Sequence, residues 1–92
     1  MTVYFIATAD RRYVKIGYTT NLTRRLRDVQ VGNPEPLELL GTLDGTKADE
    51  KAWHRAWARN RVEGEWFRLT DELAYSIEWQ LRPEPPEALF YL

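Results

Sequence analysis

The sequence contains no cysteine, a single histidine and no long hydrophobic run. Without cysteine, disulfides, cysteine-rich zinc sites and thiol nucleophiles are excluded, so any metal must be held by oxygen ligands or by His54. The longest apolar run covers residues 3–7, far short of the roughly 20 residues that span a membrane. The N-terminus also lacks the charged segment followed by an apolar one that is typical of a signal peptide. We therefore expect a soluble, cytoplasmic protein without a membrane partner.

The length of 92 residues and the composition, 43% hydrophobic and 29% charged, are those of one ordinary globular domain. We expect this domain to cover residues 1–82. Three prolines between residues 83 and 86 exclude a helix there, so residues 83–92 are predicted to form a proline-rich C-terminal tail. The sequence has no internal repeat and no linker long enough to separate two domains.

The net charge is only −1, but basic residues are concentrated in two segments. Residues 1–30 carry six basic and two acidic side chains, and residues 47–61 carry five and two, whereas residues 62–92 carry seven acidic and two basic ones. If the two basic segments fold onto one face, that face can bind a phosphate backbone. Arginine-rich faces are about as often only solvated, so charge alone leaves both interpretations open. The candidate nucleic-acid-binding residues are Arg11, Arg12, Arg24, Arg27, Lys51 and Arg55.

Hydrophobic periodicity and capping residues predict a mixture of strands and helices. Residues 2–8 and 13–18 are rich in β-branched and aromatic side chains and are predicted to form a hairpin. Leu22, Leu26 and Val29 recur at helical spacing behind capping side chains, which predicts a helix over residues 22–31. The further predicted elements are a strand at residues 37–43, a helix from a Thr46–Asp49 capping box to about residue 60, a short extended piece at residues 66–67, and a helix at residues 70–81.

The predicted hairpin raises the question of Lys15. Alternation places it on one face of its strand together with Gly17, among apolar and aromatic residues. Such a lysine has two explanations: a general base whose pKa is lowered by burial, or a permanently charged clamp for phosphate. The sequence leaves both open.

Glu50 and His54 are four residues apart on the predicted second helix, so they are neighbours on one face. A carboxylate beside an imidazole can hold a divalent ion or a proton. A surface glutamate next to a hydrogen-bonded histidine is the commoner reason for this spacing. Trp53 and Trp57 lie beside the pair, and such tryptophans are more often core residues than a platform for stacking bases.

Together these residues form a pattern that extends over residues 3–69. Its parts are, in order, Val3-Tyr4-Phe5-Ile6, Lys15-Ile16-Gly17, Arg25 eight residues after that glycine, a strand, Glu50 on a helix, and Gly64-Glu65-Trp66-Phe67. The pattern resembles the GIY-YIG nuclease superfamily, in a branch of small phage and bacterial proteins with lysine in place of the tyrosine of the second motif. The first motif departs from the superfamily because no glycine precedes Tyr4.

The resemblance implies an α+β fold in which a three-stranded antiparallel sheet is flanked by helices. It also implies a divalent-metal-dependent endonuclease that hydrolyses phosphodiester bonds in nucleic acid, DNA rather than RNA, with Mg²⁺ (or Mn²⁺) as cofactor. The alternative is a catalytically weak or inactive nucleic-acid-binding module of the same fold. So small a chain has little surface for reading bases, so specificity would come from a homodimer or from a larger partner protein.

The resemblance also assigns roles to single residues. Glu50 would hold the metal ion, Arg25 would neutralise the charge that develops on the phosphate, and Tyr4 would position or deprotonate the attacking water. His54 would serve as base, metal ligand or support for Glu50. The expected catalytic residues are Tyr4, Lys15, Arg25, Glu50 and His54, with Glu50 as the metal ligand.

Overall fold

The computed structural model describes residues 1–81, so the predicted tail at residues 83–92 lies outside the described residues. The elements, in chain order, are β1 (Thr2–Thr8), β2 (Tyr13–Thr19), α1 (Leu22–Val31), β3 (Leu37–Asp44), α2 (Lys47–Ala56), the 3-10 helix η1 (Ala58–Asn60), β4 (Arg61–Glu63), β5 (Trp66–Arg68) and α3 (Asp71–Leu81). The predicted hairpin, first helix, third strand and third helix are confirmed to within one residue at each end. The α+β class is confirmed as well.

The sheet is larger than expected. Within residues 1–81 it has five antiparallel strands in the order β3-β1-β2-β5-β4, so the prediction of three strands was wrong. The two additional strands form a hairpin at the outer edge of β2. Each is only three residues long, which is too short to show an alternation pattern. Gly64, at a φ of 55°, provides the left-handed conformation that their tight turn requires.

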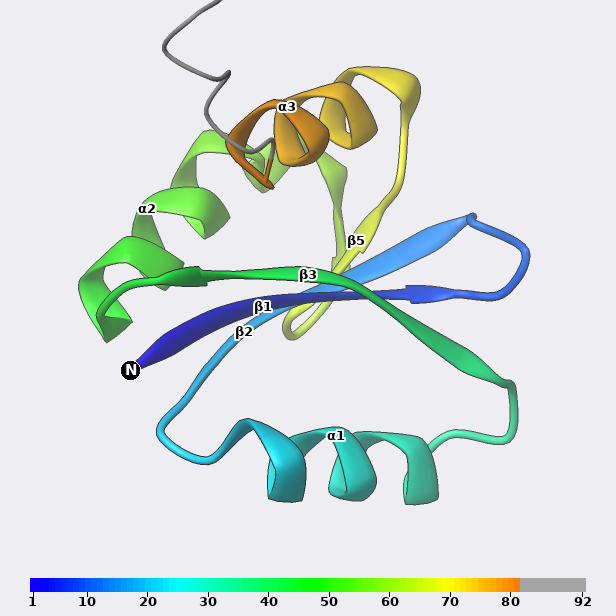
Figure 1. The fold of residues 1–92 in the computed structure, drawn as a ribbon. Coiled ribbons are helices and arrows are strands. Elements are labelled where there is room, and N and C mark those ends of the chain that lie inside the picture. The colour runs from blue at the N-terminus through cyan, green and yellow to red at the C-terminus, as the bar shows by residue number, and fades with distance from the viewer. Residues whose placement is uncertain (82–92) are drawn as a thin grey trace, which may run out of the picture.

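The helices cover the two faces of the sheet unequally. Figure 1 shows α1 under one face and α2 and α3 over the other. The core lies between the sheet and α2 and α3, and its buried members are Val3, Phe5, Val14, Ile16, Phe67, Leu73 and Ile77. Trp53 and Trp57 pack against this cluster, which confirms them as core residues. The opposite face, with Tyr4 and Lys15, is turned towards α1.

Local capping explains where α1 and α2 begin. The side chain of Asn21 accepts a hydrogen bond from the backbone N–H of Arg24 at 3.1 Å, and the predicted capping box of Thr46 and Asp49 is present. Helix α2 ends at Ala56 rather than near residue 60. The chain tightens there into η1, from which it enters β4. Among residues 1–81, no helix has the length and apolar character needed to cross a membrane.

Candidate functional site

The position of Tyr4 is determined by the residue opposite it in the hairpin. Strand register pairs Tyr4 with Gly17, and a Cβ atom at residue 17 would overlap the hydroxyl and ring of Tyr4. The phenol therefore lies flat across β2. Tyr4 is 0% exposed, and its hydroxyl has no hydrogen-bond partner within residues 1–81. A buried hydroxyl without a partner is costly, so this one calls for a ligand or water.

The electrostatics around Tyr4 keep its phenol neutral. Burial raises the pKa of Tyr4 to about 12, with further increases from the charges of Glu65 and Glu50, while the guanidinium of Arg25 lowers it. At neutral pH the hydroxyl thus retains its proton and can donate a hydrogen bond. Of the two roles expected for Tyr4, this supports positioning of a water molecule over its deprotonation.

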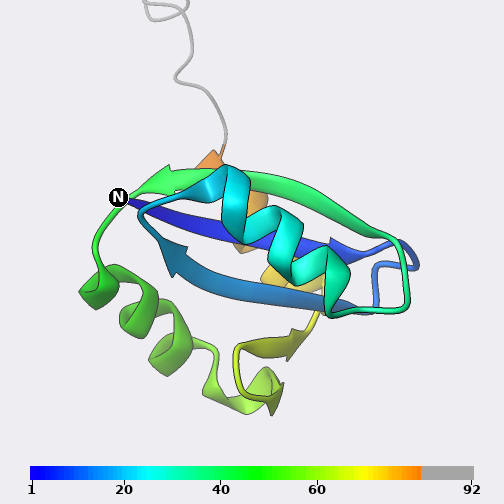
Figure 2. The ribbon, with the colours of Figure 1, turned by 90° about the horizontal axis from the view of Figure 1, so that it is seen from below.

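The second half of β2 has an open edge. Strand β5 pairs only with Tyr13–Lys15, and α2 runs along the edge beyond that point (Figure 2). The Nε2–H of His54 donates to the backbone oxygen of Ile16 at 2.7 Å, since a carbonyl can only accept. Its Nδ1 then carries the lone pair and accepts from a guanidinium N–H of Arg61 at 3.2 Å. Both ring nitrogens of His54 are therefore engaged.

Glu50, His54 and Glu65 meet at this edge. One potential ligand atom from each lies within 4.8 Å of the others. Glu50 is 9% exposed and forms no ion pair within residues 1–81. Burial raises its pKa, the charge of Glu65 and a side-chain contact with Glu65 raise it further, and His54 and Lys47 oppose the increase. Two carboxylates and an imidazole nitrogen that face one another are a ligand set for a divalent cation.

Lys15 borders this cluster as a paired cation. Its ammonium lies 3.5 Å from a carboxylate oxygen of Glu65 and 5.6 Å from the centre of the Trp66 ring, and its side chain is 17% exposed. A lysine that already contacts an anionic oxygen is placed to contact the oxygens of a phosphate as well. The contact therefore favours the phosphate clamp over the general base.

Arg24 and Arg25 differ in direction although they are adjacent. Arg25 is exposed on α1, lies close enough to Tyr4 to affect its pKa, and forms no ion pair within the described residues. Arg24 points outward and lies 3.9 Å from Asp28 in an exposed pair. Only Arg25 is thus joined to the cluster around Tyr4.

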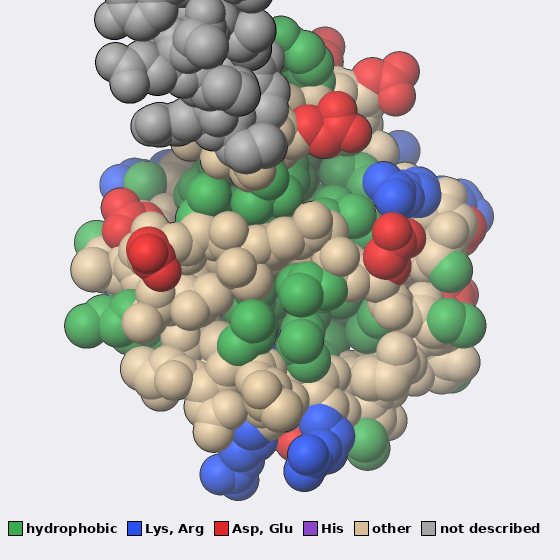
Figure 3. Space-filling model, in the orientation of Figure 1, with side chains coloured by type: hydrophobic (Ala, Val, Ile, Leu, Met, Phe, Trp, Pro, Cys, Tyr) green, Lys and Arg blue, Asp and Glu red, His purple; other side chains and the backbone are tan. Residues whose placement is uncertain are grey.

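The basic side chains proposed to bind nucleic acid lie at three places: on α1, on α2 and in the turn between β1 and β2. Those of α1 are exposed on the lower edge of the molecule in Figure 3, and Lys51 and Arg55 are exposed on α2 beside Glu50 and His54. Both sets therefore flank the candidate site. The turn between β1 and β2 places Arg11 and Arg12 at the far end of the hairpin, beyond the end of β1 at Thr8.

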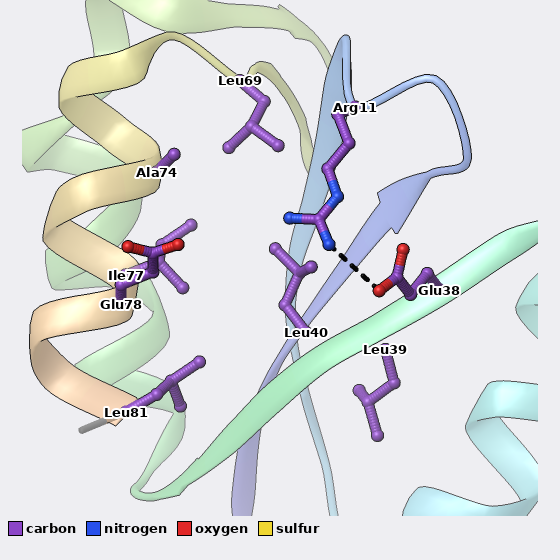
Figure 4. Close-up of a pocket in the computed structure, with 9 residues that line it drawn as sticks. All are labelled: Arg11, Glu38, Leu39, Leu40, Leu69, Ala74, Ile77, Glu78 and Leu81. Atoms are coloured by element: carbon purple, nitrogen blue, oxygen red, sulfur yellow. Dashed lines mark hydrogen bonds and ion pairs between the residues drawn. The ribbon is translucent and has the colours of Figure 1, made fainter.

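Arg11 is engaged elsewhere. It forms an ion pair with Glu38 at 3.0 Å and lines a cavity of about 280 Å³ between β3 and α3, shown in Figure 4. The guanidinium of Arg12 lies 5.8 Å from the centre of the Tyr13 ring. The structure does not bring these two arginines together with the other candidate residues.

Two residues of the site were not identified from the sequence. Glu65 entered the pattern only as part of the Gly64-Glu65-Trp66-Phe67 motif, without a role of its own, and Arg61 was counted only among the basic residues of residues 47–61. The sequence shows Glu65 as a carboxylate directly before the aromatic pair Trp66-Phe67. Glu65 reaches the site only because β5 pairs with β2, and a strand of three residues is too short for this pairing to be predicted.

The family model of the T5orf172 domain matches residues 1–80. The chain belongs to the T5orf172 domain family. T5orf172 domains are nuclease-like, DNA-binding domains, which is compatible with a function related to nucleic acids but is not evidence of catalysis. Comparison with curated proteins and with solved structures found no match.

Membership of the T5orf172 family corrects the resemblance drawn from the sequence. The resemblance to the GIY-YIG superfamily rests on a few short motifs and is wrong, because the family that matches over residues 1–80 is a different one. The departures at the residue before Tyr4 and at Lys15 agree with this correction. Tyr4 packs directly against Gly17, so this tyrosine–glycine pair is explained by packing and does not identify a family.

Proposed function

We propose that this T5orf172 domain is a divalent-metal-dependent endonuclease that hydrolyses phosphodiester bonds in nucleic acid, DNA rather than RNA. The observation that supports it is the buried carboxylate of Glu50, which faces a second carboxylate and an imidazole between two exposed basic helix faces. Carboxylate oxygens are the preferred ligands of Mg²⁺ and Mn²⁺. Glu50 would hold such an ion at the open edge of β2.

The surrounding side chains then have distinct tasks. Lys15 and Arg25 bind the phosphate, and Arg25 neutralises the negative charge that develops on it. Tyr4 donates a hydrogen bond that orients the attacking water, because its phenol keeps its proton. The cation, when bound, supplies a water of lowered pKa and stabilises charge on the phosphate oxygens. His54 holds α2 against the Ile16 carbonyl and so keeps Glu50 in place.

The basic residues outside the cluster would hold the neighbouring phosphates. Arg24 and Arg27 on α1 and Lys51 and Arg55 on α2 are exposed on the two helices that flank the site. Contacts of this kind give affinity and orientation without reading the sequence of the nucleic acid.

The test is incubation of the full chain with plasmid DNA and with single-stranded DNA, in the presence of Mg²⁺, Mn²⁺ or EDTA. We expect cleavage with a divalent metal and none with EDTA. Cleavage that persists in EDTA would contradict the role of the metal. Wild-type protein that cleaves neither substrate with either metal would contradict the enzyme.

A second candidate function, binding without cleavage, has one observation in its favour. Both nitrogens of His54 are engaged and the phenol of Tyr4 is neutral, so neither side chain is free to act as a base. A binding module needs only the basic helix faces. Retention of DNA on the protein in a gel-shift assay, together with no cleavage under any of the conditions above, would select this function.

A further inference from the structure

We infer that Glu65 and His54 complete, together with Glu50, a three-ligand site for one divalent transition-metal ion, and that this site takes Mn²⁺ in preference to Mg²⁺. The inference rests on the proposed function in using Glu50 as a ligand. It adds Glu65 as a ligand, selects the metal-ligand role among those open for His54, and adds a metal preference.

The spacing of the three groups fits a single ion. Two ligands that are each about 2.2 Å from one ion can be at most about 4.4 Å apart. The candidate ligand atoms of Glu50, His54 and Glu65 all lie within 4.8 Å of one another. Three atoms that all bind one ion at this distance can be at most about 3.8 Å from one another. Side-chain rotations that move the glutamate carboxylates by about 1 Å would therefore bring all three groups into coordination distance.

Positively charged side chains contact two of the three proposed metal ligands. The ammonium of Lys15 lies 3.5 Å from Glu65, and the guanidinium of Arg61 donates to Nδ1 of His54 at 3.2 Å. Each of these two ligands thus already contacts a positive charge, and a bound metal ion would supply a positive charge at the same place. Both cationic side chains are long and reach the cluster from its rim, so they can turn towards a phosphate when a metal takes their place.

The hydroxyl of Tyr4 is a second observation that points to a ligand at this position. It is fully buried without a hydrogen bond among the described residues, next to Glu50, which is 9% exposed and faces another carboxylate. A buried polar group without a partner costs free energy, and a bound water or ion is one way in which it is satisfied. A cation between the carboxylates and a water beside Tyr4 would satisfy both groups.

The imidazole sets the metal preference. Because Nε2 of His54 donates to the Ile16 carbonyl, the ring is held with Nδ1 as its ligand atom. Mg²⁺ prefers a shell of oxygen ligands, whereas transition metals accept imidazole nitrogen readily. Two carboxylates and one imidazole therefore favour Mn²⁺.

The experiment is calorimetric titration of the full chain with Mn²⁺ and with Mg²⁺, without nucleic acid. We expect one Mn²⁺ per chain, bound more tightly than Mg²⁺. Glu65→Gln should weaken Mn²⁺ binding by about tenfold or more, since loss of a supporting group alone can have that effect. Glu63→Gln, at an exposed glutamate of the same hairpin, is the matched control and should bind as the wild type does.

Weaker Mn²⁺ binding by Glu65→Gln could also result from a damaged fold, so a second variant is chosen that should bind Mn²⁺ more tightly. Lys15→Gln removes the cation that competes for Glu65, so it should bind Mn²⁺ more tightly than the wild type. Equal Mn²⁺ affinity of Glu65→Gln and Glu63→Gln would overturn the inference, as would a wild type that binds no Mn²⁺ or prefers Mg²⁺. Tight Mn²⁺ binding by a protein that cleaves no DNA would leave the inference intact and remove only the proposed nuclease.

Discussion

Gly17 and Tyr4 show how one glycine can position a functional side chain. The ring of Tyr4 occupies the space that any side chain at residue 17 would need. The phenol is thereby held over β2, near the carboxylates of Glu50 and Glu65. The contact is steric, so it can be tested independently of any chemistry.

Gly17→Ala should therefore destabilise the fold and misplace Tyr4. We expect a loss of roughly 1–3 kcal/mol in the free energy of unfolding, as for other overpacked cores, measured by urea denaturation. Gly32→Ala is the control, because its added Cβ would meet its nearest neighbour at an ordinary 3.5 Å. Similar losses in the two variants would show that Tyr4 does not depend on Gly17.

Glu50→Gln should remove metal-dependent cleavage, down to the level seen with EDTA, while the fold and DNA binding persist. Its raised pKa means that ionised Glu50 opposes folding at neutral pH, so the neutral glutamine should leave the free energy of unfolding unchanged or higher. Cleavage assays and urea denaturation measure the two effects. Undiminished cleavage by this variant would exclude Glu50 from the site.

Arg25→Ala and Arg24→Ala form a matched pair on one helix. Only Arg25 approaches Tyr4, so its removal should lower turnover by about a hundredfold, as for loss of one charge-stabilising group. Arg24→Ala should mainly weaken DNA binding and its salt dependence. Equal effects of the two substitutions on turnover would refute the assignment of Arg25.

The pKa of Tyr4 gives a stability profile at alkaline pH. The folded value is about 12 and the unfolded value about 10, so the unfolded chain loses its proton first as the pH rises. The stabilising effect is complete below about pH 10 and is lost towards pH 12. Tyr4→Phe should flatten this decline in urea denaturation at pH 9–11, whereas Tyr75→Phe, at an exposed tyrosine, should not.

At the scale of single elements, α2 separates three tasks by helical spacing. Trp53 and Trp57 face the core, Glu50 and His54 face the edge of β2, and Lys51 and Arg55 are exposed on the adjoining face. Most of this was predictable, because residues four apart share a face. The contact of His54 with the Ile16 carbonyl was not, since it depends on where β5 stops pairing with β2.

The basic face of α2 can be tested as a unit. Replacing both Lys51 and Arg55 by alanine should weaken DNA binding and reduce the slope of log affinity against log salt by about two, one for each lost phosphate contact. The same double substitution at Arg11 and Arg12 should leave the slope nearly unchanged, because these residues lie at the far end of the hairpin. Fluorescence anisotropy over a range of salt concentrations measures both. Equal reductions would mean that the nucleic acid extends along the hairpin.

At the scale of the whole molecule, the slight net negative charge conceals an uneven distribution. Basic side chains over α1 gather along the lower edge of the face in Figure 3, whereas most acidic side chains on that face lie towards the opposite side. The segment charges of the sequence predicted this separation. They did not show that α1 and α2 flank one site, because that follows from their packing on the two faces of a sheet.

The sequence alone determined the features that depend on neighbouring residues: β1, β2 and β3, the helix caps, and the pairing of Glu50 with His54. Their patterns are local, so a short window contains the information. The tertiary structure alone decided that β4 and β5 extend the sheet, and with them that Glu65 meets Glu50 and Lys15. Such contacts join residues distant in the chain, and they form only when the packed sheet determines which edge of β2 remains open.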